Sequence, residues 1–203
     1  MVGGVRPHFS KNWGYIIRGD SYFSYNSNPK RKVLLTQSAA GPCCLCRKTA
    51  FLKIHFEDER WIDFCQYSLG DDQLFFYKLY RYGNKVLLST DANITHLDGR
   101  GGHGKMDYWE KMFSFAVLRY LLWYRTIYEP SCNGIQRACA WISFFIFKTL
   151  RDLPLRLWFL IRYKTIRLFT TESRAHSEAK RIIRDVLSGY PSFLAHCVNK
   201  KTI

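Results

Sequence analysis

The chain has 203 residues, of which 47% are hydrophobic and 17% aromatic, so it is long and apolar enough to bury the core of one domain, or of one domain plus an appendage. This composition excludes general disorder. The 31 Lys and Arg residues exceed the 16 Asp and Glu residues, and the net charge of +15 favours an anionic partner such as phosphate, nucleic acid or a membrane surface.

The cysteines and the longest apolar run limit where the protein works. Seven cysteines without dense regular spacing, and no apolar signal segment at the start, favour a reducing cytosol over a secreted disulfide scaffold. The longest uncharged apolar run, residues 138–147, is far short of the roughly 20 residues of a membrane span. We therefore expect a cytoplasmic protein.

The first segments of the chain contain turns and small residues. Residues 1–36 predict loops around short strands, with a turn signal at Asp20-Ser21. Gly41 and Pro42 precede a short apolar run, as in a strand that another backbone or a ligand approaches closely, so both are candidate acceptor-binding residues. Cys43 and Cys46 form a C-x-x-C pair, but no second pair follows at zinc-finger spacing, which favours buried small side chains over a metal site.

An acidic segment follows a short helix expected over residues 47–56. Residues 56–63 gather acidic side chains around Trp61, whose ring could form a wall of a sugar-binding site. A solvated acidic loop with one anchored aromatic residue is an equal alternative. Trp61 is therefore a candidate acceptor-binding residue.

Two adjacent carboxylates, Asp71 and Asp72, open a helix that apolar residues of helical period predict up to Gly83-Asn84. Helix capping explains one aspartate, because Asp is a favoured N-cap and stabilises a helix N-terminus. The second carboxylate is then available as a general base, provided that it lies within hydrogen-bond reach of the proton it removes.

A strand expected over residues 85–95 leads to His96, which stands beside a glycine-rich loop at residues 99–104. Such a histidine is either a structural residue or a metal ligand, and both alternatives stay open. The loop has neither the P-loop pattern nor the dinucleotide fingerprint.

The second half predicts helices over residues 106–128, 135–147, 154–169 and 172–187. The third of these carries Arg and Lys among Leu, Trp, Phe and Ile. This composition suits a helix at a membrane interface and equally suits an ordinary basic surface helix.

Four segments in order resemble the acceptor half of family 2 glycosyltransferases, particularly the bacterial enzymes that assemble surface polysaccharide. These segments are residues 38–51 (SAAGPCCLCRKTAF), 56–61 (FEDERW), 70–83 (GDDQLFFYKLYRYG) and 91–98 (DANITHLD). The resemblance covers roughly residues 22–128, and the order and spacing of the four segments carry it.

The resemblance implies an α/β fold: a partial GT-A-like, Rossmann-like domain over residues 1–128, followed by a basic amphipathic helical extension over residues 129–203. It implies that Asp72 is the base that deprotonates the acceptor hydroxyl and that Asp71 supports it. It also implies that His96 helps to hold a divalent metal, Mg²⁺ or Mn²⁺, which neutralises the nucleoside diphosphate leaving group.

The chain departs from the family at its start. The acceptor-half segments begin within the first forty residues, and no Asp-x-Asp metal motif is present, so we expect a truncated enzyme whose nucleotide-binding half is missing. The predicted function is transfer of a sugar from a nucleotide-sugar donor to a carbohydrate or lipid-linked acceptor, at the inner face of the cytoplasmic membrane. The alternative is a basic module without enzymatic activity, which binds an anionic membrane surface or nucleic acid; large aliphatic residues between the helical cations disfavour nucleic acid.

Overall fold

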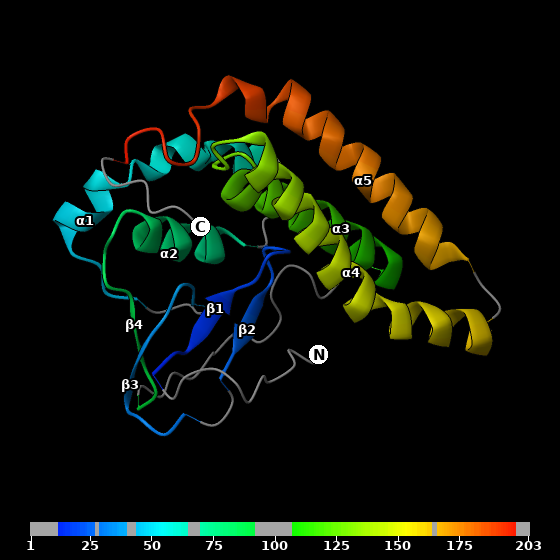
Figure 1. The fold of residues 1–203 in the computed structure, drawn as a ribbon, viewed down its shortest axis with the longest axis horizontal. Helices are drawn as coiled ribbons and strands as arrows, with labels where there is room; N and C mark the ends of the chain where they lie inside the picture. Colours follow the sequence, from blue (N-terminus) through cyan, green and yellow to red (C-terminus); the bar gives the residue numbers. More distant parts are fainter. Residues whose placement is uncertain are drawn as a thin grey trace.

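The structure is a computed structural model that describes residues 12–26, 29–39, 44–64, 70–91, 107–163 and 166–197. Two small sheets and the short helices lie on one side, and three long helices project from them on the other (Figure 1). The predicted positions Gly41, Pro42 and His96 lie outside the described residues.

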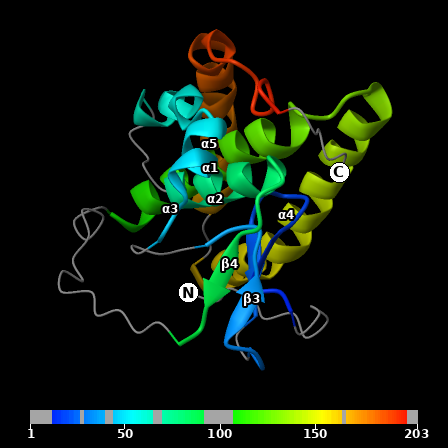
Figure 2. The ribbon, with the colours of Figure 1, turned by 90° about the vertical axis from the view of Figure 1, so that its left-hand side faces the viewer.

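Four short strands form two antiparallel pairs. The pairs are β1 (Tyr15–Ile17) with β2 (Phe23–Tyr25), and β3 (Val33–Leu35) with β4 (Leu87–Ser89). A parallel bridge between Trp13 and Leu35 joins the two pairs. Gly14 lies at this junction, where an added Cβ would come within 2.9 Å of the Leu88 side chain. Figure 2 shows β3 and β4 side by side below α2.

Two short helices and a 3₁₀ segment follow the first strands. They are α1 (Lys48–Lys53), the 3₁₀ segment η1 (Phe56–Phe64) and α2 (Asp71–Arg81). The sequence prediction of a helix ending at Gly83-Asn84 is confirmed. Gly83 has a φ of 85°, and the N–H groups of Gly83 and Asn84 donate to the carbonyls of Tyr80 and Leu79, which are the two bonds of a Schellman C-cap.

The next helix, α3 (Tyr108–Trp123), continues into a π-helical turn, η3 (Tyr124–Tyr128). Asp107 and Glu110 form a capping box at its start, which fixes where the helix begins. The helix predicted over residues 106–128 is therefore confirmed, with a change of hydrogen-bond pattern in its last turn.

The last helices are α4 (Gly134–Tyr163), α5 (Arg167–Asp185) and the short 3₁₀ turn η4 (Leu187–Gly189). The expectation of two helices separated before Pro154 is wrong, because α4 runs through that proline. Proline removes the backbone bond to the carbonyl of residue 150. Leu150 and Pro154 are both exposed, so water can satisfy that carbonyl.

One continuous hydrophobic cluster runs from Ile54 to Cys197 and contains side chains of α2, α3, α4 and α5. The domain boundary predicted after residue 128 falls inside this cluster. Both sheets among the described strands are antiparallel pairs, and the GT-A-like α/β fold stays a prediction. None of the described helices is both long enough and apolar enough to cross a bilayer.

Candidate functional site

The start of α2 presents the two predicted carboxylates. Asp71 and Asp72 occupy the first turn of α2, and both are exposed. The N-cap is Gly70, with no side-chain capping bond, so the interpretation of one aspartate as the cap is wrong. Both carboxylates instead lie where the helix macrodipole favours negative charge.

Gly70 is fixed at this position by two independent constraints. Its φ is 119°, a conformation that residues with a Cβ rarely adopt. A Cβ would also lie 3.0 Å from the Leu122 side chain and 3.4 Å from that of Leu118. The helix start therefore packs closely on α3, with Asp71 and Asp72 directly after the contact.

The turn between β1 and β2 lies beside the same helix start. Gln73 donates a hydrogen bond from Nε2 to the carbonyl of Ser21, which has a φ of 59°. The Ser21 hydroxyl is 3.2 Å from that of Thr126 in η3. Asp20, fully buried in the same turn, pairs with Arg18 and with Arg119 of α3. This turn therefore connects α2 to α3 next to the carboxylate pair.

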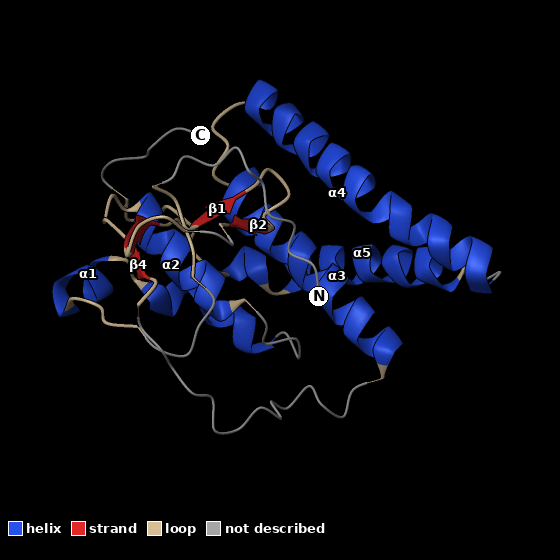
Figure 3. Cartoon of the chain, turned by 90° about the horizontal axis from the view of Figure 1, so that it is seen from below, coloured by secondary structure: helices blue, strands red, loops and turns tan. Residues whose placement is uncertain are grey.

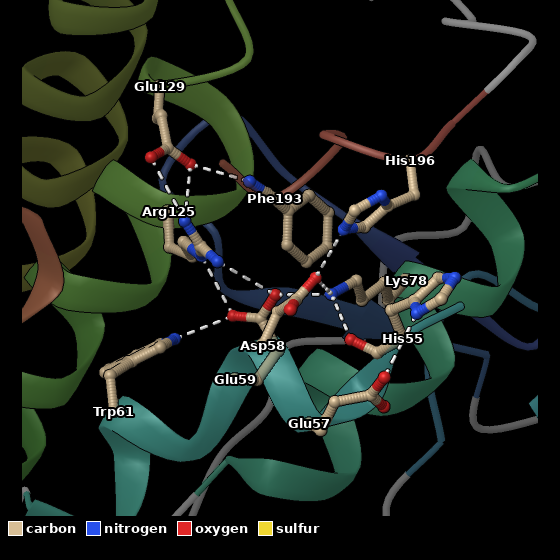
Figure 4. Close-up of polar contacts among 10 residues, drawn as sticks. All are labelled: His55, Glu57, Asp58, Glu59, Trp61, Lys78, Arg125, Glu129, Phe193 and His196. Carbon is tan, nitrogen blue, oxygen red and sulfur yellow. Dashed lines mark hydrogen bonds and ion pairs between the residues drawn. The ribbon is translucent and has the colours of Figure 1, made fainter. Parts of the chain in front are cut away.

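A buried carboxylate, Glu59 of η1, contacts α2 through Lys78 (Figure 4). It accepts hydrogen bonds from Trp61 Nε1 at 2.7 Å, from Lys78 Nζ at 2.7 Å, and from the Arg125 guanidinium at 2.9 and 3.1 Å. Glu59 is 1% exposed, and Lys78 and Arg125 are fully buried. A buried charge is costly unless it is paired and hydrogen-bonded, and these contacts meet that requirement.

The network extends to the C-terminal segment. Arg125 donates to both carboxylate oxygens of Glu129, at 3.1 and 2.9 Å, and Glu129 accepts the backbone N–H of Phe193 at 2.9 Å. Burial raises the pKa of Glu129, and the charge of Arg125 opposes this shift. The Phe193 ring lies 5.7 Å from Lys78 Nζ, so residues 190–197 pack back onto α2.

Two histidines and two acids form the partly exposed rim of the network. Lys78 also donates to the carbonyl of His55 at 3.0 Å, and His196 Nε2 lies 3.4 Å from Asp58. The His55 ring contacts Glu57 at 3.0 Å and the His196 ring at 4.4 Å between centroids. A backbone hydrogen bond, with a smaller effect from His55, lowers the pKa of Glu57.

This network has a structural role and not a catalytic one. Both oxygens of Glu59 already accept hydrogen bonds from buried cations, so this carboxylate is not placed to take a proton from a substrate. Its effect is to fix η1, α2 and η3 relative to one another. The carboxylate pair thus stands on a helix whose position is rigidly held, which is what a site needs from its supporting residues.

The other predicted site residues are either buried or not arranged as a binding site. Trp61 is fully buried, with its indole N–H on Glu59, so the ring presents no face to an acceptor in this structure. The expectation that the C-x-x-C thiols are buried is wrong for Cys46, which is free and exposed, as is Cys44, while Cys43 lies outside the described residues. Within the described ranges, no group of three or more His, Cys, Asp or Glu side chains is placed to hold a metal ion.

The sequence prediction did not single out Glu59, Lys78, Arg125 or Glu129. A signal was present: Lys78 follows Leu74 by four residues and Arg125 follows Leu121 by four, so each cation stands on the apolar face of its helix. A cation on such a face indicates a buried acidic partner. The sequence does not say which acid that partner is.

No protein-family model, curated protein or solved structure matches the chain. The similarity to glycosyltransferases consequently rests on the sequence segments alone.

Proposed function

We propose that this chain is the acceptor-side part of a glycosyltransferase, in which Asp72 removes the proton of the acceptor hydroxyl and Asp71 supports it. The observation that carries the proposal is the exposed pair of carboxylates in the first turn of α2, whose N-cap is a glycine. Both carboxylates directly follow Gly70, whose close approach to Leu122 and Leu118 fixes the helix start on α3.

The proposed step is a displacement at the anomeric carbon of a nucleotide sugar. The acceptor oxygen forms a bond to that carbon as the bond to the diphosphate breaks, and the Asp72 carboxylate takes up the hydroxyl proton. A positioned base of this kind contributes roughly 10²–10⁴-fold to the rate. The described residues offer no complete set of metal ligands, so we assign no step to the divalent metal implied by the resemblance.

The proposed place of the reaction is the inner face of the cytoplasmic membrane, where a lipid-linked acceptor would present its hydroxyl group. The net charge of +15 supports this location, because it draws the chain to anionic lipid headgroups.

Substitution of the base tests the proposal. Asp72→Asn keeps the size of the side chain and removes its basicity, so sugar transfer should fall by at least about 10²-fold. Asp91→Asn is the matched control, because Asp91 is another exposed aspartate, paired with Lys32 on the strand side of the molecule. Transfer would be measured with radiolabelled nucleotide sugars and extracted lipid-linked acceptors, with a donor-binding half supplied, and circular dichroism would confirm folding. Equal transfer by Asp72→Asn and Asp91→Asn would refute the role of Asp72.

The second candidate function, a basic binding module without enzymatic activity, is supported by the same charge of +15. Filter binding of DNA and RNA across a salt series separates the two. Tight binding that weakens steeply with salt would favour the module, because each neutralised phosphate adds to the salt slope.

A further inference from the structure

One face of α4 carries an unbroken apolar line. Hydrophobic residues recur there at intervals of three and four, and we call them the α4 stripe: Ile135, Cys139, Ile142, Ile146, Leu150, Leu153, Leu157 and Ile161. The pattern repeats after about 11 residues, which is close to three full turns of a straight α-helix. The stripe therefore stays on one side of the helix for about 39 Å.

Every residue of the α4 stripe is exposed, with exposed fractions of 77% at Ile135, 69% at Leu150 and 76% at Ile161. In the first half of α4, Ala140 and Phe144 bury the opposite face against the core. Beyond Phe144, none of the side chains that the structure describes in α4 is buried. Figures 1 and 3 show α4 running along the outside of α3 and α5.

A helix with this much uncovered apolar surface needs a partner, because most helical stability in proteins comes from burial of the apolar face. An apolar patch of this size on a surface usually marks an interaction site.

The charges of α4 indicate which partner fits. The helix carries five cations, none of them on the stripe, and one acid: Arg137, Lys148, Arg151, Arg156 and Arg162, with Asp152. A second copy of α4 would bring two strongly basic helices together without acidic residues to pair them. A left-handed coiled coil would in addition need a seven-residue repeat. Anionic headgroups provide the opposite charge, and an acyl boundary provides the apolar medium.

We propose that α4 lies in the interface of an anionic phospholipid bilayer, with the α4 stripe among the upper acyl chains and the exposed cations Arg137 and Arg162 reaching the phosphates; Arg156 is instead paired with Glu172 of α5. Interfacial helices bind in this way, parallel to the membrane plane. The exposed Trp158 suits the headgroup level. This inference concerns α4 alone and holds whether or not Asp72 acts as a base.

Vesicle flotation with matched charge substitutions tests the inference. The full chain should float with phosphatidylcholine vesicles that contain phosphatidylglycerol, and much less with phosphatidylcholine alone. The double variant Leu150→Glu/Leu157→Glu should lower the partition coefficient by at least about tenfold, because two apolar side chains leave the acyl boundary. The control Leu45→Glu/Leu52→Glu changes the net charge equally at residues that are 103% and 59% exposed, before and within α1, and should retain most of the binding.

Cysteine alkylation provides a second measurement on the unaltered chain. Cys139 of the stripe and Cys44 before α1 are both exposed and free, so a charged maleimide should label both in solution. Anionic vesicles should protect Cys139 and leave Cys44 reactive, as measured by peptide mass spectrometry.

Three results would overturn the inference. They are absence of flotation with anionic vesicles, equal binding by the two double variants, and equal flotation with both kinds of vesicle, which would remove the requirement for anionic lipid. Sedimentation that shows a dimer of the unaltered chain and a monomer of the stripe variant, without flotation, would assign the stripe to a second copy instead. None of these results affects the Asp72 transfer assay, so the two proposals fail separately.

Discussion

Removal of the buried charge of Glu59 should strongly destabilise the fold. In Glu59→Gln the side chain keeps its size, but Lys78 and Arg125 lose the carboxylate that both contact within 3.1 Å. Arg125 retains Glu129, and Lys78 retains the His55 carbonyl at 3.0 Å and Asp58 at 3.8 Å. Breaking a buried ion pair by removing one partner costs about 3–5 kcal/mol. Because both cations retain a second contact, we expect a loss near the lower end of that range.

The measurement is urea unfolding followed by circular dichroism and tryptophan fluorescence, with thermal unfolding beside it. A loss of about 3 kcal/mol corresponds to a fall in Tm of roughly 6–12 °C for a chain of this size. Glu57→Gln is the control, because Glu57 lies two residues away with a side chain that is 65% exposed, and a surface substitution of this kind changes the stability by about 0.5 kcal/mol or less.

Equal unfolding free energies for Glu59→Gln and Glu57→Gln would refute the structural role of the network. A double-mutant cycle adds a sharper criterion. If Lys78 and Glu59 compensate each other, Lys78→Met combined with Glu59→Gln should cost less than the sum of the single changes, with a coupling energy of about 0.5–3 kcal/mol.

Three further predictions concern other parts of the fold. Gly70→Ala should destabilise the fold by about 1–3 kcal/mol, and Gly83→Ala by less. Both glycines have a positive φ, but only at Gly70 would an added Cβ also meet the Leu122 side chain. Urea unfolding midpoints compare the two variants, and a larger loss of stability in Gly83→Ala would contradict the close packing at Gly70. Burial, with a smaller effect from Lys180 and Lys148, lowers the pKa of His176 below 6.5. The contribution of His176 to stability is therefore complete above pH 6.5 and decreases as the pH falls through that value. The loss of stability in His176→Gln, relative to the unaltered chain, should shrink at acid pH, and a loss that does not depend on pH would refute this. Asp20→Asn should destabilise by about 3–5 kcal/mol, because Arg18 and Arg119 lose the charge of the buried carboxylate that they share. A change below about 0.5 kcal/mol would show that the β1–β2 turn is not anchored there.

Local sequence signals predicted most helices, because the start and end of a helix depend on neighbouring residues. The Gly83-Asn84 end of α2 and the start of the helix after residue 106 follow from capping and apolar period alone. The division of α4 at Pro154 was wrong because a proline is assumed to end a helix. Leu150 and Pro154 are exposed, so water can satisfy the carbonyl that loses its backbone bond, and that exposure is a property of the packing.

The candidate site shows the same difference between local and distant information. The doublet Asp71-Asp72 and its place at a helix start were determined by the sequence itself. That the N-cap is Gly70 and not one of the aspartates was visible only in the tertiary structure, in which Gly70 has a positive φ and lies close to Leu122 of α3. Trp61 was predicted as a sugar-binding wall from its acidic neighbours, whereas the structure buries it, with its indole N–H donating to Glu59.

The sequence by itself determined the charge, the helix ends, the carboxylate doublet and the apolar period of residues 135–161, since each depends on residue type and short spacing. Only the tertiary structure decided that Glu59 pairs with Lys78 and Arg125 and that the α4 stripe is left uncovered. Pairing and exposure depend on which surfaces meet across long separations in the chain, and no local pattern encodes that.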